Sequence, residues 1–235
     1  MKILRAGRED ARLRFAMEGH LLRNFGGRHH LVRCDAVLAD PPSLVLELVG
    51  PESLRDRLLT GPLPLRLALA CLRQAADALG WLHQHGVYHR DLKPSNILLA
   101  DDGTWRVIDL SVAAHGDPPR GLPDGWIEEE IGTAGYAAPE LLARPDTTTP
   151  AIDVYSLGVV LYEALSGRWP VELAPGETDR QYRARAAAGP EPVGLRLRGD
   201  YPPAVVRTVM RAVDPDPAAR FASVADLVVA LGGLG

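Results

Sequence analysis

His89-Arg90-Asp91-Leu92-Lys93-Pro94-Ser95-Asn96 is the stretch of this chain that decides its fold. It brings a carboxylate, an ammonium and an amide close together in the sequence, at Asp91, Lys93 and Asn96. A carboxylate can orient a hydroxyl group, an ammonium can offset the charge of a phosphate, and an amide oxygen can bind Mg²⁺. The spacing therefore predicts one loop that holds a hydroxyl, a phosphate and a metal ion together.

A hairpin directly after this stretch supplies a second metal ligand. Residues 97–99 are apolar, residues 105–108 are apolar apart from Arg106, and the Asp-Asp-Gly turn at 101–103 lies between them. Such a pattern predicts two antiparallel strands joined by a tight turn. The hairpin folds Asn96 and Asp109 back beside each other, and the carboxylate of Asp109 is the harder oxygen ligand that Mg²⁺ prefers.

Composition excludes several classes of protein. The 235 residues are 46% hydrophobic and 24% charged, with a net charge of -4, so no basic surface for nucleic acid is expected. The two cysteines, Cys34 and Cys71, do not make a disulfide framework and indicate a reducing compartment. The start of the chain has no apolar signal segment, and the apolar run at 154–165 is too short to span a bilayer. We therefore expect a cytoplasmic chain with no membrane segment.

The periodicity of apolar residues predicts a few strands first and helices afterwards. This order indicates an α+β fold in which strands and helices form separate layers. Strands are expected at 2–5, 31–38 and 44–48, and helices at 11–25, 65–85, 139–142, 152–166, 179–188, 203–212 and 223–231.

Three later motifs complete a resemblance to a known family. They are Gly-Thr-Ala-Gly-Tyr-Ala-Ala-Pro-Glu at 132–140, Asp-Val-Tyr-Ser-Leu-Gly at 153–158, and Asp-Pro-Asp-Pro-Ala-Ala-Arg at 214–220. Together with the opening stretch they resemble the eukaryotic-like (Hanks-type) Ser/Thr protein kinases of bacterial type. The resemblance runs over nearly the whole chain and implies a buried ion pair between Glu140 and Arg220.

The resemblance implies a bilobal fold and a phosphoryl transfer reaction. Residues 1–48 correspond to an N-lobe with a truncated sheet, and residues 49–235 to a mainly helical C-lobe. Asp91, Lys93 and Thr133 correspond to the catalytic residues. The implied reaction transfers the γ-phosphoryl group of ATP, with Mg²⁺, to a Ser or Thr hydroxyl of a protein substrate.

The family's nucleotide site maps onto residues from both parts of the chain. Only two of the 26 basic residues are lysines, Lys2 and Lys93, and both fall where the family uses a lysine. Glu18 corresponds to the helix glutamate that pairs with the first of them. The implied ATP contacts are Lys2, Glu18, Leu46 as gatekeeper, Glu47 and Leu48 in the hinge strand, Lys93, Asn96 and Asp109; the implied metal ligands are Asn96 and Asp109.

The chain departs from the family at its Gly-rich loop. No Gly-x-Gly-x-x-Gly occurs, and only Met1 precedes Lys2. A shortened version of an ordinary kinase, with its true start upstream, is our first expectation; a chain that naturally lacks this lid over the phosphates is the second. The loss favours an alternative function, that of a weak or inactive pseudokinase acting as a binding module. The exposed edge of a shortened sheet also predicts self-association.

Two further departures concern the loop after the hairpin. Asp109-Leu110-Ser111 replaces the family's Asp-Phe-Gly, and a serine in place of glycine would resist positive φ. Residues 112–132 contain no Ser, Thr or Tyr, but they contain the acidic run 128–130, which we expect to pair with Arg90 and order the loop without phosphorylation. A small-molecule phosphotransferase of the aminoglycoside type is a third candidate, and the Ala-Pro-Glu at 138–140 argues against it.

Overall fold

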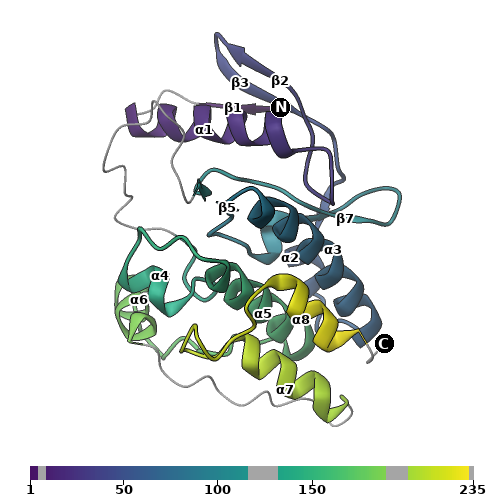
Figure 1. Ribbon diagram of the computed structural model, residues 1–235, viewed down its shortest axis with the longest axis vertical. Helices are drawn as coiled ribbons and strands as arrows, with labels where there is room; N and C mark the ends of the chain where they lie inside the picture. Colours follow the sequence, from purple (N-terminus) through teal and green to yellow (C-terminus); the bar gives the residue numbers. More distant parts are fainter. Residues whose placement is uncertain (5–8, 116–131, 189–200, 233–235) are drawn as a thin grey trace.

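The computed structural model describes residues 1–4, 9–115, 132–188 and 201–232 (Figure 1). A thin layer of one helix and three strands lies at one end of the molecule, and a larger, mainly helical part makes up the rest. The predicted α+β class is confirmed, and from residue 139 onward every element of the described residues is a helix.

The first layer is an antiparallel sheet against one helix. Its strands are β1 (Lys2–Ile3), β2 (Cys34–Ala39) and β3 (Pro42–Leu46), in the order β1-β3-β2, and its helix is α1 (Glu9–Phe25). Lys2 lies opposite Leu44 on β3, so both side chains stand on the same face of the sheet. Leu44 is fully buried on this face. The register therefore turns the Lys2 side chain inward although β1 is an edge strand.

The strand expected at 44–48 ends early. β3 stops at Leu46, and the main-chain N–H of Glu47 donates to Arg33 before the chain leaves the sheet. The carboxylate of Glu47 accepts the N–H of Arg33 in return, at 3.0 Å. The side chain of Leu48 is 96% exposed, so nothing holds this residue in a ladder.

The larger part begins with a short strand at Glu52 and contains all remaining elements. Its helices pack around one another, and its strands form two small sheets, β4-β6-β7 and β5-β8. The elements are β4 (Glu52–Ser53), α2 (Leu54–Leu58), α3 (Leu65–Gln84), β5 (Val87–Tyr88), the 3₁₀ turn Pro94–Asn96, β6 (Ile97–Leu99), β7 (Trp105–Val107), β8 (Ala114–His115), α4 (Pro139–Ala143), α5 (Pro150–Ser166), α6 (Asp179–Ala187), α7 (Pro203–Ala212) and α8 (Val224–Leu231).

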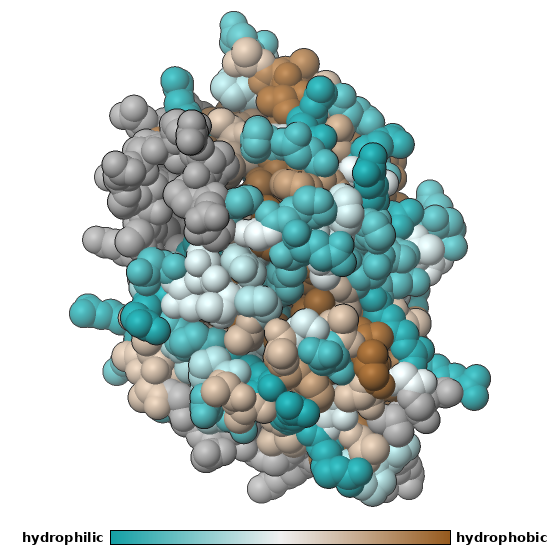
Figure 2. All heavy atoms as spheres, viewed as in Figure 1, coloured by the Kyte–Doolittle hydropathy of each residue, from teal (hydrophilic) through white to brown (hydrophobic). Residues whose placement is uncertain are grey.

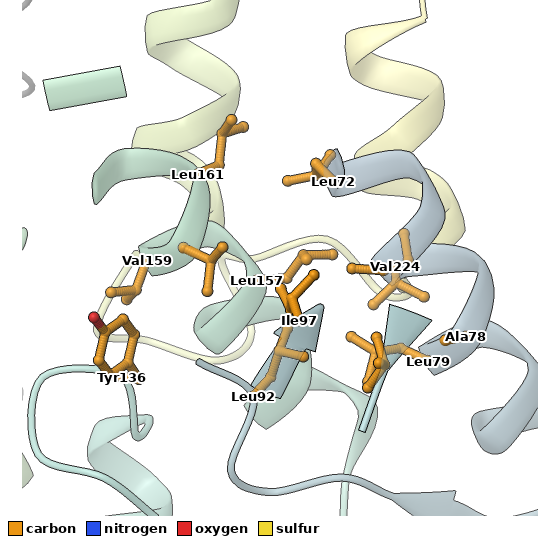
Figure 3. Close-up of a cluster of buried hydrophobic side chains, with 14 of the residues drawn as sticks. Leu72, Ala78, Leu79, Leu92, Ile97, Tyr136, Leu157, Val159, Leu161 and Val224 are labelled. Atoms are coloured by element: carbon orange, nitrogen blue, oxygen red, sulfur yellow. The ribbon is translucent and has the colours of Figure 1, made fainter. Parts of the chain in front are cut away.

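Helix α5 is the centre of this part. Every residue from Ile152 to Leu165 is buried, because α5 packs against α3 on one side and α7 on another. Leu157, Val159 and Leu161 of α5 lie in a cluster with side chains of α3 and the β6 strand (Figure 3). A helix that is apolar all round is stable only when other elements cover it completely. The sequence-based prediction of a buried helix at this position is confirmed.

Four short elements of the larger part were not predicted. The strands β4, β5 and β8 have two residues each, which is too few to show a periodic pattern. Helix α2 has five residues and begins with a capping box, in which Ser53 and Asp56 satisfy each other's main-chain N–H groups. That Ser-x-x-Asp pattern is readable in the sequence, so α2 could have been found. Among the described residues no helix is long and apolar enough to cross a membrane.

Candidate active site

A buried carboxylate of helix α5 holds the backbone of the loop His89–Asn96 in place. Asp153, in the first turn of α5, is fully buried and accepts the main-chain N–H groups of His89 and Arg90, both at 2.9 Å. It also bonds the imidazole of His83 at 2.8 Å. Burial opposes the ionisation of Asp153, but these hydrogen bonds outweigh it and lower its pKa. One ionised side chain thus fixes the loop's backbone to two helices.

Arg90 is drawn into the protein beside this anchor. Its backbone φ of 67° is left-handed, a conformation that residues other than glycine rarely adopt. Its side chain is largely buried. Burial lowers its pKa to about 10, an effect only partly offset by Asp153 and Asp146. One nitrogen donates to the carbonyl oxygen of Pro145 at 2.6 Å, whereas Nε is buried and has no hydrogen-bond partner among the described residues. The expected pairing with the acidic run 128–130 lies outside the described residues.

Three of the predicted residues form a closed ring of hydrogen bonds. The ammonium of Lys93 donates to Asp91 at 2.7 Å and to the hydroxyl of Thr133 at 2.6 Å. The same hydroxyl donates to the other carboxylate oxygen of Asp91 at 2.7 Å. Thr133 is 42 residues away from Asp91 in the chain, so only the fold brings them together. The ring presents a hydroxyl group, a base and a cation within bonding distance of one another.

The hairpin brings Asn96 and Asp109 together as predicted. Ile97 and Val107 pair across β6 and β7, and the N–H of Ile108 donates to the carbonyl oxygen of Asn96 at 2.9 Å. The amide nitrogen of Asn96 donates to the carbonyl oxygen of Asp91 at 2.9 Å. This bond leaves the amide oxygen of Asn96 as the atom that could bind a cation.

The loop after the hairpin does not require a positive φ at Ser111. The left-handed residue is Asp109, with a φ of 67°, and Ser111 has no positive φ. Aspartate tolerates this conformation because its carboxylate can bond its own backbone, and here it accepts the N–H of Ser111 at 3.1 Å. The left-handed residue of this loop is therefore stabilised by its own side chain.

Lys2 connects α1 to the hairpin. Its ammonium bonds both carboxylate oxygens of Glu18 at 2.8 Å and Asp109 at 3.1 Å, which confirms the predicted pair. Burial alone would lower the pKa of Lys2, but the two carboxylates raise it above its usual value. Burial raises the pKa of Glu18, and the charge of Lys2 offsets only part of this. Burial also opposes ionisation of Asp109, yet Lys2 and Ser111 hold the pKa of its carboxyl at about 2.

The structure locates the predicted hinge residues on the connection between the two parts. Leu46 ends β3 and is half-buried, and Glu47 is engaged with Arg33. Leu48 points its side chain into solvent, so only its main chain could face a nucleotide. These three residues lie in sequence directly before the larger part of the molecule begins.

The predicted ion pair between Glu140 and Arg220 is confirmed. Arg220 uses two nitrogens on the two carboxylate oxygens, at 2.6 and 2.9 Å. Its other donors reach the carbonyl oxygens of Asp214, Ala151 and Pro215. The side chain of Arg220 is 0% exposed, and the pair ties α4 to the segment before α8.

Sequence reasoning missed a second network behind Thr133. The hydroxyl of Tyr136 donates to Glu163 at 2.5 Å and accepts the indole N–H of Trp169 at 3.2 Å. A Cβ on Gly135 would lie 2.9 Å from the Trp169 ring, so the loop backbone rests directly on the indole. The residues come from distant parts of the sequence, and nothing in their local pattern indicates this contact.

The donor atoms at Asn96 and Asp109 fit a hard cation. They offer an amide oxygen and a carboxylate that stays ionised at neutral pH. Across the described ranges, no group of three or more His, Cys, Asp or Glu side chains could hold a metal ion by itself. Mg²⁺ is commonly bound by one or two protein oxygens together with phosphate oxygens and water. The residues therefore fit Mg²⁺ that arrives with a nucleotide.

A fold of this kind, with an Asp–Lys–Thr ring beside a Lys–Glu pair and two oxygen ligands, defines the protein kinases. A sequence profile described as "Protein kinase domain" matches residues 1–198, and the chain belongs to this family. A serine/threonine-protein kinase of Corynebacterium efficiens is 36% identical over 80% of the chain, and PknA of Mycobacterium tuberculosis is 39% identical over 77%. PknB of Mycolicibacterium smegmatis is 34% identical over 79%. The chain spans 38%, 40% and 29% of the lengths of these relatives, respectively.

Proposed function

We propose that this chain transfers the γ-phosphoryl group of ATP to a serine or threonine hydroxyl of a protein substrate. The observation that carries the proposal is the ring of Asp91, Lys93 and Thr133. In it a threonine hydroxyl already donates to Asp91, which is the contact that an acceptor hydroxyl needs before it attacks a phosphoryl group. The relatives named above are serine/threonine-protein kinases, which supports the same acceptor.

Each residue of the site has a definite task in this proposal. Asp91 orients the acceptor hydroxyl and accepts its proton as the new bond to phosphorus forms. Lys93 offsets the negative charge of the phosphoryl group while it moves between oxygens. Asp109 and Asn96 would hold Mg²⁺, which neutralises phosphate charge when bound. Lys2, kept in place by Glu18, lies beside Asp109 and supplies a further positive charge for the phosphates.

The nucleotide base would reach the connection between the two parts. Leu46 would limit the depth of its pocket, and the main chain at Glu47 and Leu48 would contact the adenine. We further propose that the division into 1–48 and 49–235 separates the part that carries Lys2 from the part that carries Asp91. This is supported by the end of β3 at Leu46 and the start of β4 at Glu52.

The cysteines and the apolar surface of the first layer bear on where the chain acts and whether it self-associates. Cys34 and Cys71 are both free and buried, which supports a reducing, cytoplasmic setting. Apolar surface gathers over β2 and β3 on the face in Figure 2, where Val37 and Leu38 are exposed. Self-association through this end of the molecule stays a prediction. No specific observation favours the alternative of a binding module without catalysis.

Phosphate transfer from radiolabelled ATP tests the proposal. The purified chain with Mg²⁺ should label a general protein acceptor such as casein, and acid hydrolysis should yield phosphoserine or phosphothreonine. Asp91→Asn should lower the rate by a factor of about 10²–10⁴, because it removes the proton acceptor. Asp101→Asn, in the exposed turn of the hairpin, is the matched control and should leave the rate unchanged. Equal rates for both variants would show that Asp91 has no catalytic role.

A further inference from the structure

Arg183 of α6 bridges its own helix and the loop that carries Thr133. Its Nε donates to Asp179, one turn earlier on α6, at 2.8 Å. Its Nη2 donates to the carbonyl oxygen of Gly132 at 2.6 Å, across 51 residues of sequence. The Arg183 side chain is 19% exposed and Asp179 is 60% exposed, so the bond to Gly132 is the more shielded of the two.

The acceptor of this bond is one peptide unit away from the proposed reaction centre. Gly132 directly precedes Thr133, whose hydroxyl bonds Asp91 and Lys93. The carbonyl of Gly132 belongs to the same planar peptide group as the N–H of Thr133, so a rotation of one moves the other. A contact that holds this carbonyl in place therefore also holds the backbone from which the Thr133 side chain projects.

Gly132 has little freedom to move toward the loop beneath it. It has a φ of 78°, and a Cβ here would lie 2.8 Å from Ala137 and 3.3 Å from the carbonyl oxygen of Arg90. This side of the glycine is therefore closed by packing. The guanidinium of Arg183 holds the carbonyl through a charge-assisted bond, which is stronger than a neutral hydrogen bond.

Helix α6 is a firm base for such a contact. Thr178 and Gln181 form a capping box at its start. Tyr182 is buried and donates its hydroxyl to the carbonyl oxygen of Val171, and Arg185 makes a two-pronged pair with Glu177. The helix is therefore fixed at several points that are independent of Gly132.

We propose that Arg183 is a positioning residue for phosphoryl transfer, which acts through Gly132 on Thr133 and so on Asp91. The inference rests on the proposed kinase function. It assigns to α6, which contributes no side chain to the ring of Asp91, Lys93 and Thr133, the task of setting the geometry of that ring. A lysine should not replace Arg183 fully, because Arg183 reaches Asp179 and Gly132 with two separate nitrogens of one rigid plane, whereas a lysine has a single nitrogen on a flexible stem.

Steady-state kinetics of Arg183→Ala and Arg183→Lys test this role. Loss of a hydrogen bond from a charged donor should lower kcat/KM for the protein substrate by about tenfold to hundredfold. The KM for ATP should stay the same, because the contacts proposed for ATP are not made by α6. Arg180→Ala, which removes an exposed arginine from the same helix, is the matched control and should match the wild type. A rise in the KM for ATP similar to the loss in kcat/KM would indicate a general structural role and overturn the proposal.

A double-mutant cycle identifies the route of the effect. In a Thr133→Ala background, Arg183→Ala should lower kcat by no more than about twofold, because the two residues act as a unit. The same fold-loss in both backgrounds would show that Arg183 does not act through Thr133.

Amide hydrogen exchange separates this inference from the proposed function. Peptides covering 132–138 should exchange faster in Arg183→Ala than in Arg180→Ala or the wild type, whether or not the chain is active. Unchanged exchange would overturn the placement of Arg183. Faster exchange in a chain without any kinase activity would retain the contact and reject the kinase function.

Discussion

The two parts of this molecule hold their charged groups in different ways. In the larger part, Asp153 and Arg220 are buried and bonded mostly to main-chain groups, so the backbone itself is fixed around them. In the first layer, Lys2 is 38% exposed and is held by the side chains of Glu18 and Asp109. The position of a charged group that is bonded to the backbone depends on the whole fold. The position of a charged group that is bonded to other side chains depends mainly on those side chains.

The difference indicates which contacts determine the free energy of unfolding and which respond to pH. A buried charge that loses its partner leaves an uncompensated group in a low dielectric, which destabilises the protein strongly. A partly exposed pair is screened by water and contributes little to folding. We therefore expect the helical part to dominate the free energy of unfolding, and the Lys2 contacts to respond to pH without affecting the fold.

The largest effect should come from Arg220→Ala. The change leaves Glu140 without its partner and three carbonyl oxygens without their donor, so the free energy of unfolding should fall by about 3–5 kcal/mol. Thermal or urea denaturation measures the loss. Arg207→Ala, an exposed arginine on α7, is the control and should change stability by less than about 0.5 kcal/mol. An unchanged midpoint for Arg220→Ala would show that the buried charges of the helical part do not dominate the free energy of unfolding.

A pair of helical glycines offers a second contrast. A Cβ on Gly158 of α5 would lie 2.7 Å from the Cβ of Ala212 and 3.1 Å from its backbone, which cannot move aside. Gly158→Ala should therefore destabilise the protein by about 1–3 kcal/mol through overpacking.

The matched change in the first layer should be nearly neutral. A Cβ on Gly19 of α1 would meet only the ends of Leu44 and Val37, and Val37 is 45% exposed. The better helix propensity of alanine, up to about 1 kcal/mol, should offset the contact in Gly19→Ala. Equal losses for Gly19→Ala and Gly158→Ala in urea denaturation would mean that the two parts are packed equally tightly.

The effect of Lys2→Met should be small and should depend on pH. Without the lysine, burial raises the pKa of Glu18 further above its unfolded value. The folded state then binds a proton more tightly than the unfolded state, so the variant loses stability as pH rises. The deficit relative to wild type should be near zero at about pH 5 and approach about 1 kcal/mol at neutral pH. Adding Glu18→Gln to Lys2→Met should make the stability deficit the same at both pH values. If the deficit of Lys2→Met alone were the same at both pH values, Glu18 would not be its cause.

Much of the fold and site could be predicted because its signals are local or belong to the family. The Asp-Asp-Gly turn at 101–103 predicted the hairpin, and the hairpin brought Asn96 to Asp109. The scarcity of lysine drew attention to Lys2, and its pairing with Glu18 followed from the resemblance. The helices were predicted because their apolar residues repeat over several turns.

The rest depends on contacts that no local pattern encodes. Arg183 is one arginine among many, and nothing near it indicates a carbonyl 51 residues away. The left-handed φ of Asp109 was not predicted, and its carboxylate stabilises the turn by accepting the N–H of Ser111. The two-residue strands β4, β5 and β8 pair with segments far away in the sequence and are too short to show a periodic pattern.

The carboxylate of Asp153 has a consequence for how the site comes into being. It joins α3, through His83, to α5 and to the backbone of the catalytic loop. The loop can take its left-handed turn at Arg90 only when both helices are already packed, since the anchor lies between them. The reactive arrangement is therefore part of the cooperative folding unit of the helical core, and it cannot form before that core does or outlast its unfolding.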